Sequence, residues 1–245
     1  MWKFLYRLSS LKYYYEWSGK WVPWLLGSTA VLMLVGLYWG LVVAPSDYQQ
    51  GESYRIIYVH VPSAWMSMFV YVVMAGAGFI AIVWRTKLSE IVVSECAVIG
   101  AMFTALALVT GMLWGKPTWG TYWQWDARLT SELILLFLYF GIIAVHSVIE
   151  ESRTAARVAS ILAIIGVINI PIIHYSVTWW SSLHQPNMLL VSKTPSVHPS
   201  MLYPLLVMAT AFQLYFVSLL FIRMRNAILH RERLTSWVQD ISTRN

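Results

Sequence analysis

The sequence predicts an all-α integral membrane protein, a bundle of six transmembrane helices with both termini in the cytoplasm. Only 11% of its 245 residues are charged and 58% are hydrophobic, whereas about 25% charged residues are usual in a soluble domain. The apolar residues gather in six long blocks, and a membrane-spanning helix needs roughly 20 of them in a row. The basic residues are shared unequally between the two faces that these blocks define. We therefore expect one membrane domain over residues 1–245.

Each apolar block predicts one span. Five blocks contain no Asp, Glu, Lys or Arg. The fourth block is shorter and equally free of them, and a charge on it can come only from His146. The first block is too long for a cleaved signal peptide, so we expect it to be retained as a span. The predicted spans cover residues 21–43, 59–84, 96–115, 133–149, 158–180 and 201–222.

The Lys and Arg residues predict which face is which. Cytoplasmic loops of membrane proteins carry an excess of Lys and Arg. Most of the 17 basic residues lie in the N-terminal segment, in the loops after spans two and four, and in the C-terminal tail. We therefore place these segments in the cytoplasm, and we assign the net charge of +6 to topology and anionic lipid rather than to nucleic acid. The outer segments hold Arg55, Lys116, Arg128 and Lys193.

The second outer loop, at about residues 114–132, is dense in aromatic residues. Gly115, Pro117 and Gly120 are expected to break the third helix at the membrane surface, because Pro lacks an N–H and Gly weakens a helix. A single Trp in such a loop is usually an interfacial anchor. The density here instead indicates a flat apolar platform for a large planar ligand. Its members are Trp114, Trp119, Tyr122, Trp123 and Trp125.

Charged residues accompany the platform. Arg128 can pair with a carboxylate through two parallel hydrogen bonds, and Asp126 can orient a polar group of a ligand. Asp126 can equally cap the helix that follows. For Glu132 we favour a helix-dipole role at the start of that helix. Arg55, in the first outer loop, either meets a ligand carboxylate or pairs with an acidic neighbour in its own loop.

Two histidines at the outer ends of spans can provide ligands. His60 lies at the start of span two, and His184 follows span five. Histidines from different segments can ligate the iron of a metal–porphyrin from both faces. A lone interfacial histidine is, however, more often a structural hydrogen-bonding residue. His198 is the best competing ligand, and we interpret His174 as a buried hydrogen-bonded residue.

The stretch WGTYWQWDARLTS resembles the tryptophan-rich WWD signature of a haem-handling protein family. The six spans, the length and the two outer histidines resemble one branch of it, the haem exporter proteins C of the bacterial cytochrome c maturation system. The similarity extends over essentially the whole chain. Tyr122 stands where many members have a third adjacent Trp, and it preserves the aromatic face.

This resemblance implies a function. Members hold haem b as a transient cargo at the periplasmic face of the inner membrane and present it to a periplasmic haem chaperone, protein E. They work beside a small membrane subunit, protein D, and an ABC-type pair, proteins A and B. By position, His60 and His184 match the family's proposed axial ligands. Trp119, Trp123, Trp125 and Asp126 match the signature.

Two other functions compete with haem delivery. A transporter that moves haem across the bilayer usually has polar or broken helices near the midplane, and such features are sparse here. A structural subunit would use the Trp-rich loop only as an anchor. The sequence contains no recognisable nucleophile, triad or phosphate loop, so we do not expect an enzyme.

Overall fold

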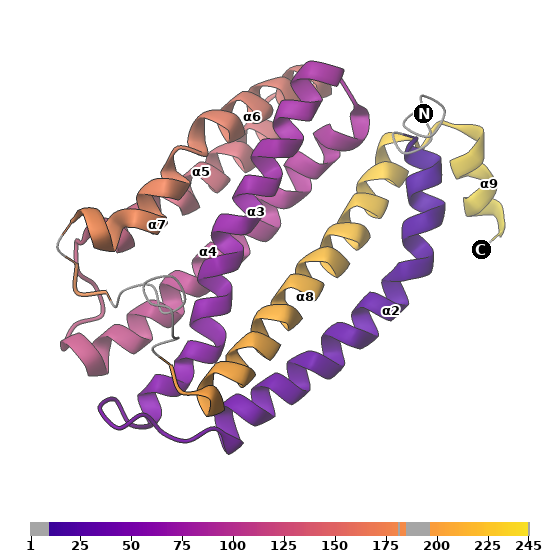
Figure 1. Ribbon diagram of the computed structural model, residues 1–245. Helices are drawn as coiled ribbons and strands as arrows, with labels where there is room; N and C mark the ends of the chain where they lie inside the picture. The colour runs from indigo at the N-terminus through magenta and orange to yellow at the C-terminus, as the bar shows by residue number, and fades with distance from the viewer. Residues whose placement is uncertain (1–9, 181, 185–196, 245) are drawn as a thin grey trace.

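A computed structural model describes residues 10–180, 182–184 and 197–244, and Figure 1 shows them as a bundle of long helices. Apart from an isolated bridge between Asp47 and Gly51, these residues form helices, turns and irregular segments. The elements are α2 (Leu11–Tyr38), the π-helix η1 (Trp39–Val43), the 3₁₀ helix η2 (Glu52–Ile56), α3 (Ile57–Trp84), α4 (Lys87–Trp119), α5 (Ala127–Val148), α6 (Ser152–Gly166), α7 (Asn169–Trp179), α8 (Pro199–Arg231) and α9 (Ser236–Arg244).

The six predicted spans are confirmed within the described residues. Six helical segments are long and apolar enough to cross a membrane. Span one joins α2 to η1, and span five joins α6 to α7. The helices extend past the apolar blocks because polar residues at the membrane surface continue the same hydrogen-bond ladder. The all-helical fold follows from the requirement that backbone N–H and C=O groups be satisfied inside the bilayer.

The first and last spans form a pair at one side of the bundle. In Figure 1, α2 and α8 run side by side at one edge of the bundle, and α8 also packs against α3 and α4. Small residues allow the close approach, since a Cβ added at Gly36 would lie 2.5 Å from Sδ of Met208. A buried hydroxyl pair, Thr29 and Ser218, joins the two helices at 3.3 Å. Small residues and buried hydrogen bonds are typical of contacts between membrane helices.

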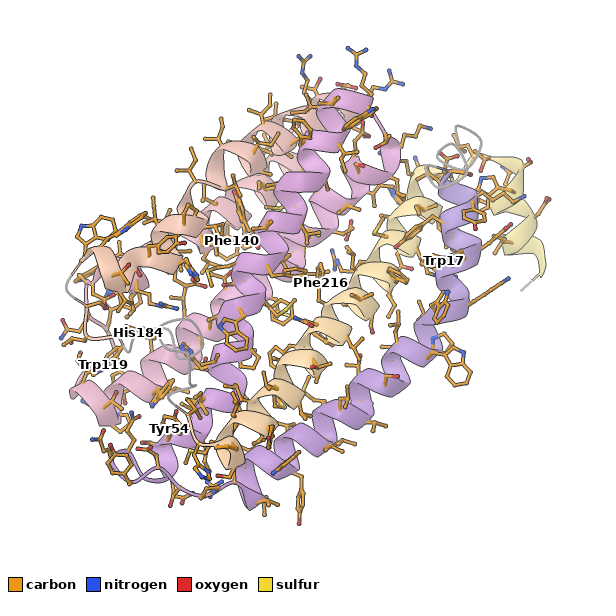
Figure 2. All side chains as sticks on the ribbon, viewed as in Figure 1. Trp17, Tyr54, Trp119, Phe140, His184 and Phe216 are labelled. Atoms are coloured by element: carbon orange, nitrogen blue, oxygen red, sulfur yellow. The ribbon has the colours of Figure 1, made fainter. Side chains whose placement is uncertain are left out.

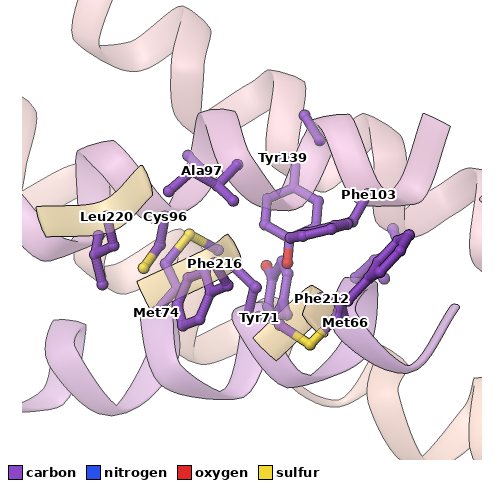
Figure 3. Packing of buried hydrophobic residues seen from close by; sticks show 14 of the residues in the cluster. Met66, Tyr71, Met74, Cys96, Ala97, Phe103, Tyr139, Phe212, Phe216 and Leu220 are labelled. Carbon is purple, nitrogen blue, oxygen red and sulfur yellow. The ribbon is translucent and has the colours of Figure 1, made fainter. Parts of the chain in front are cut away.

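Aromatic rings fill the centre of the bundle (Figure 3). Tyr71 and Tyr139 are fully buried and meet edge to face at 5.0 Å between ring centroids. Tyr139 packs directly on Gly100 of α4, and its hydroxyl donates to the Ser67 carbonyl at 2.7 Å. α3, α4 and α5 are therefore joined at one point by packing and by a hydrogen bond.

The segments that we assign to the cytoplasm lie together. Figure 1 shows both termini at one end of the bundle, the end where α3 turns into α4. The loop between η1 and η2 and the Trp-rich loop lie at the other end. This agrees with an even number of spans. That the first end faces the cytoplasm remains a prediction from the charges.

The third span does not break where we expected. α4 continues through Gly115 and Pro117 and ends at Trp119, with Gly120 in the left-handed conformation at φ 78°. Pro117 removes only one hydrogen bond, in the last turns of the helix. Thr118 Oγ1 adds a bond to the Trp114 carbonyl at 2.8 Å in the same turn. Gly120 alone ends the helix, because its positive φ is open to glycine at little cost.

The fifth span is interrupted between Gly166 and Asn169. The Tyr71 hydroxyl occupies the space beside Gly166, where an added Cβ would lie 2.1 Å from its oxygen. After the interruption, Asn169 Nδ2 donates to the Ser131 carbonyl of α5 at 2.9 Å. At the break, Asn169 therefore satisfies a carbonyl of α5 within the protein.

Candidate functional site

The two histidines proposed as ligands lie next to each other. His60 is in the first turn of α3 and His184 follows α7, yet their ring centroids are 6.2 Å apart with planes inclined by 26°. Figure 2 shows His184 beside Trp119 at the end of the bundle opposite the termini. The fold thus brings together two imidazoles from distant parts of the sequence, as we expected from their similar depth.

Hydrogen bonds define which nitrogen of His60 carries the proton. Its Nδ1 lies 3.0 Å from the Ala107 carbonyl and 3.1 Å from Thr110 Oγ1. A carbonyl only accepts, and the Thr110 hydroxyl proton is donated to the Leu106 carbonyl at 2.6 Å. The proton therefore resides on Nδ1, and Nε2 carries the lone pair. This arrangement, with one nitrogen held by a second shell, is typical of metal-ligating histidines.

Asp126 reaches the His184 segment through one serine. Its Oδ1 accepts from the Leu129 N–H at 2.8 Å, which caps α5. Its Oδ2 accepts from the Ser182 hydroxyl at 2.6 Å. Ser182 Oγ in turn accepts from the backbone N–H of His184 at 3.0 Å. The carboxylate therefore joins the start of α5 to the short segment that carries His184.

Indole rings surround the two imidazoles. Trp114 meets His60 edge to face at 5.6 Å, and Trp119 meets His184 in the same way at 5.9 Å. Trp114 is held by the first outer loop, because its Nε1 donates to Gln50 Oε1 at 2.7 Å. Trp119 packs on Gly115, where a Cβ would lie 3.1 Å from its ring. Gly115 thus permits a close approach and does not break the helix.

A largely apolar cavity of about 120 Å³ lies beside the histidines. Its walls come from α3, α4, α5, α7 and α8 as well as from the outer segments. Predicted residues that line it are His60, Trp114, Trp119, Trp123, Arg128 and His184. The fold therefore brings six of the predicted site residues together around one cavity.

Two hydrogen-bond donors in this lining point to an acceptor. Trp123 Nε1 and Arg128 Nη1 are buried, and neither finds an acceptor among the described residues. A buried donor without a partner is costly. Glu132 supplies the one carboxylate among the described lining residues, and its Oε1 accepts from the Ser67 hydroxyl at 2.7 Å.

Four of the predicted site residues lie outside the described lining of the cavity. Tyr122 and Trp125 are exposed, and Trp125 contacts Trp123 edge to face at 5.3 Å. Asp126 holds the loop as described above. Arg55 contacts Glu52 and donates to the Gly40 carbonyl at 2.9 Å, which is the loop pairing that we kept as its alternative.

The competing histidines have other surroundings. His198 is exposed, caps the start of α8 and lies 2.8 Å from Ser200 Oγ through its Nδ1. The His174 ring packs edge to face on Tyr175 at 4.7 Å. Neither is among the described residues that line the cavity.

The sequence interpretation missed several residues of the site. Glu132 was assigned to the dipole of its helix, but it lies past the first turn of α5 and is buried. Its place in a charge-poor span was the signal that could have found it, since ionisable groups in a membrane face the protein interior. Gln50, Gly111 and Ser182 carry no such signal.

Comparisons with known proteins agree over nearly the whole chain. The model of the family described as "Heme exporter protein C" matches residues 4–239. The Heme exporter protein C of Escherichia coli K12 is 49% identical over 241 residues, which cover 98% of this chain and 97% of that protein. The proteins of the same name from Bradyrhizobium diazoefficiens and Haemophilus influenzae are 50% identical over 210 residues and 45% identical over 242 residues. These alignments cover 86% and 99% of this chain, and 80% and 98% of those proteins.

Proposed function

This chain belongs to the Heme exporter protein C family, and from that premise we propose that it binds haem b at the periplasmic face of the inner membrane and delivers it to the haem chaperone, protein E. The haem is a cargo held for a short time. His60 and His184 ligate its iron. The observation that carries the proposal is the pairing of these two imidazoles beside an indole-lined cavity.

The spacing of the imidazoles supports two-sided ligation. At a metal–nitrogen distance of about 2 Å, two imidazoles on opposite sides of one metal have centroids about 6 Å apart. The observed separation is 6.2 Å. His60 also presents its Nε2 lone pair because the proton is held on Nδ1. His60 therefore needs no change of tautomer to bind the cargo's iron.

The unpartnered donors support an anionic cargo. Haem carries two carboxylates, and Arg128 Nη1 and Trp123 Nε1 both lack an acceptor among the described residues. A propionate would satisfy donors of this kind, and charge-assisted bonds of this type are the stronger ones. Arg128 and Trp123 are therefore the side chains that we assign to the propionates.

The size of the cavity supports an open site. Its volume of about 120 Å³ lies below the roughly 300 Å³ of typical ligand pockets. The cavity takes one edge of a porphyrin, and the remainder extends past it toward the exposed rings of Tyr122 and Trp125. A cargo that is only partly enclosed can be passed to a partner.

The partners and the absence of catalysis are part of the same proposal. Proteins D, A and B of the cytochrome c maturation system assemble with this chain, and protein E receives the haem. The chain acts by orienting its cargo and not as an enzyme. No Ser–His–Asp or Cys–His arrangement lies in the described lining of the cavity, so any assistance to bond formation on protein E comes from positioning.

One observation favours a second function, transport of haem across the bilayer. The break between α6 and α7 is of the kind that transporters place near the midplane. The polar side chain of Asn169 at this break, however, is bonded within the protein, to the Ser131 carbonyl. Delivery from the outer face is therefore the function that the geometry supports best.

Replacement of the two histidines tests the proposal. The full chain, purified with haem, should show the absorption spectrum of iron with two nitrogen ligands. His60→Ala and His184→Ala should each lose this spectrum, and added imidazole should restore it by filling the vacated position. His230→Ala, at the other end of the bundle, is the matched control.

An unchanged spectrum in both single variants would reject the ligand assignment. Transfer is tested separately by adding protein E to the haem-loaded chain and measuring covalent haem on protein E. Vesicles that contain this chain and are loaded with haem test the alternative. Release of haem without any partner would favour transport over delivery.

A further inference from the structure

A second cavity, distinct from the histidine site, lies at the end of the bundle that carries the termini. Its volume is about 400 Å³. It is formed by the end of α3, the start of α4, one face of α6 and the end of α8. Its charged lining residues are Arg85, Lys87, Glu90, Arg153, Arg157 and Arg231.

Of the five basic side chains in this lining, two form ion pairs with a glutamate and three do not. Arg231 pairs with Glu90 at 2.6 Å, and Lys87 pairs with Glu232 at 3.2 Å. Among the described residues, no ion pair is formed by Arg85, Arg153 or Arg157. The cavity therefore has an excess of positive charge.

The Glu151 carboxylate offsets only part of this charge. It caps α6 by accepting from the backbone N–H of Thr154 and Arg153 at 2.6 and 3.1 Å. Hydrogen bonding from Thr154 lowers the pKa of Glu151, and the charge of Arg153 contributes less. Its two oxygens are thus used by the helix end, and the guanidinium groups remain available to a ligand.

The end of α3 places Arg85 at this cavity. Arg85 has φ 53° and ends α3 in the left-handed region, a conformation in which helices commonly end. The chain turns there into α4, so that Arg85 lines the cavity together with Lys87.

Apart from Ser160, the remainder of the lining is apolar and leads to the lipid-facing surface. Ala81, Ile82 and Ala156 line the cavity, and Ile82 is exposed along the outside of α3. Ile161 is exposed on α6. A ligand with a charged head and an apolar chain would match a basic cavity beside an apolar surface better than a small anion would.

We propose that this basic cavity binds the phosphate group of an anionic phospholipid from the cytoplasmic leaflet. Arginine binds phosphate oxygens through two parallel hydrogen bonds, and basic pockets on the cytoplasmic side of membrane helices are suited to anionic headgroups. The acyl chains lie along the apolar outer surfaces of α3 and α6. This inference is independent of the haem site at the other end of the bundle.

Lipid retention by the full chain tests the proposal. The chain is purified in neutral detergent, mixed with phosphatidylglycerol or phosphatidylcholine, and analysed by native mass spectrometry for bound lipid. Arg153→Gln with Arg157→Gln should weaken phosphatidylglycerol binding about 25-fold, at about fivefold for each basic residue removed. Lys12→Gln with Arg233→Gln removes the same charge from the same end and should have little effect.

Conservative variants distinguish a loss of lipid binding from a folding defect. Arg153→Lys with Arg157→Lys keeps the charge but loses the planar fork, so it should bind phosphatidylglycerol with intermediate affinity. The thermal midpoint of every variant is measured in the same detergent. An equal loss in the Gln pair and its control would overturn the proposal, since general surface charge would then explain binding.

Two further outcomes would also overturn it. Inorganic phosphate is added to the chain in phosphatidylcholine vesicles, and binding that depends on Arg153 and Arg157 would assign the cavity to a free phosphate. If Arg153→Gln with Arg157→Gln retained lipid unchanged but lost protein A or protein B from the purified complex, the cavity would be assigned to an acidic protein surface.

Discussion

At the scale of single residues, Asp126 shows how one side chain can serve two neighbours. The sequence left open whether it caps a helix or touches a ligand. The structure shows the cap on α5 and a second bond to Ser182. Since Ser182 holds the backbone N–H of His184, Asp126 bears on the ligand position without lying in the described lining of the cavity.

Ser182→Ala is predicted to loosen His184 while leaving α5 intact. Loss of this link should weaken haem retention about tenfold, the lower end of the effects of outer-shell residues. Asp126→Asn should keep the cap, because Asn caps helices as well as Asp, and should have the smaller effect. Haem occupancy and absorption spectrum are the measurements. Full haem retention in Ser182→Ala would show that the link is unimportant.

Gly111 is predicted to position His60. A Cβ added there would lie 3.0 Å from Cε1 of the His60 ring. Gly111→Ala should therefore displace the imidazole and alter the spectrum of bound haem. Gly76→Ala, on the neighbouring helix, is the control because nothing lies within 4 Å of its added Cβ. If both variants bind haem with the wild-type spectrum, the site tolerates movement of His60.

At the scale of elements, the close contact of α4 with α5 depends on glycine. An added Cβ at Gly100 would lie 2.0 Å from Cζ of Tyr139. The ring cannot easily move away, because its hydroxyl is bonded to the Ser67 carbonyl on α3. One small residue thus allows three helices to meet.

Gly100→Ala is predicted to destabilise the fold by about 1–3 kcal/mol, the usual cost of overpacking. Gly141→Ala, on α5, adds a methyl group where nothing lies within 4 Å and should not lower stability. The thermal unfolding midpoints of both variants, measured in detergent, test this prediction. Equal midpoints would show that the Tyr139 ring shifts at little cost.

The end of α4 also shows that helix-breaking residues alone do not decide where a helix ends. Pro117 and Gly115 predicted an early end of α4, and that prediction was wrong. The helix continues because Pro117 lies in its last turn, where the missing N–H removes only one hydrogen bond, and because Gly115 gives room to the Trp119 ring. Neither compensation is visible in a list of helix-breaking residues.

At the scale of the whole molecule, the two ends of the bundle differ in chemistry. One end carries the histidine site and the indole rings that line it, and the other carries most of the arginines. Because Lys and Arg accumulate in the cytoplasm, we expect the histidine site to face the periplasm.

Cysteine labelling tests this orientation. Cys96 is the single cysteine and is buried, so Cys96→Ala provides a background without thiols. In that background, Tyr48→Cys and Leu234→Cys place thiols at residues that are 90% and 83% exposed, at opposite ends of the bundle. A maleimide that cannot cross membranes should label only Tyr48→Cys in spheroplasts. Labelling of Leu234→Cys alone would invert the topology.

The sequence by itself determined the six spans, the all-helical class and the family. A bilayer imposes its requirement along the chain, since each span must be long and apolar, and so composition is enough to find it. The sequence also identified His60, His184 and the Trp-rich loop as candidate site residues, because histidines and clustered tryptophans stand out beside long apolar spans. Their role as haem ligands stays a prediction.

Only the tertiary structure decided which of these residues meet. The approach of His60 to His184, the burial of Glu132 beside Ser67, and the link from Asp126 through Ser182 all join segments far apart in the sequence. Contacts of this kind depend on how helices pack, and packing depends on small residues such as Gly100 and Gly111. A glycine has no side chain that would indicate in the sequence which residue packs against it. The basic cavity has the same origin, because its arginines come from the end of α3, from α6 and from α8 and are brought together only when the bundle forms.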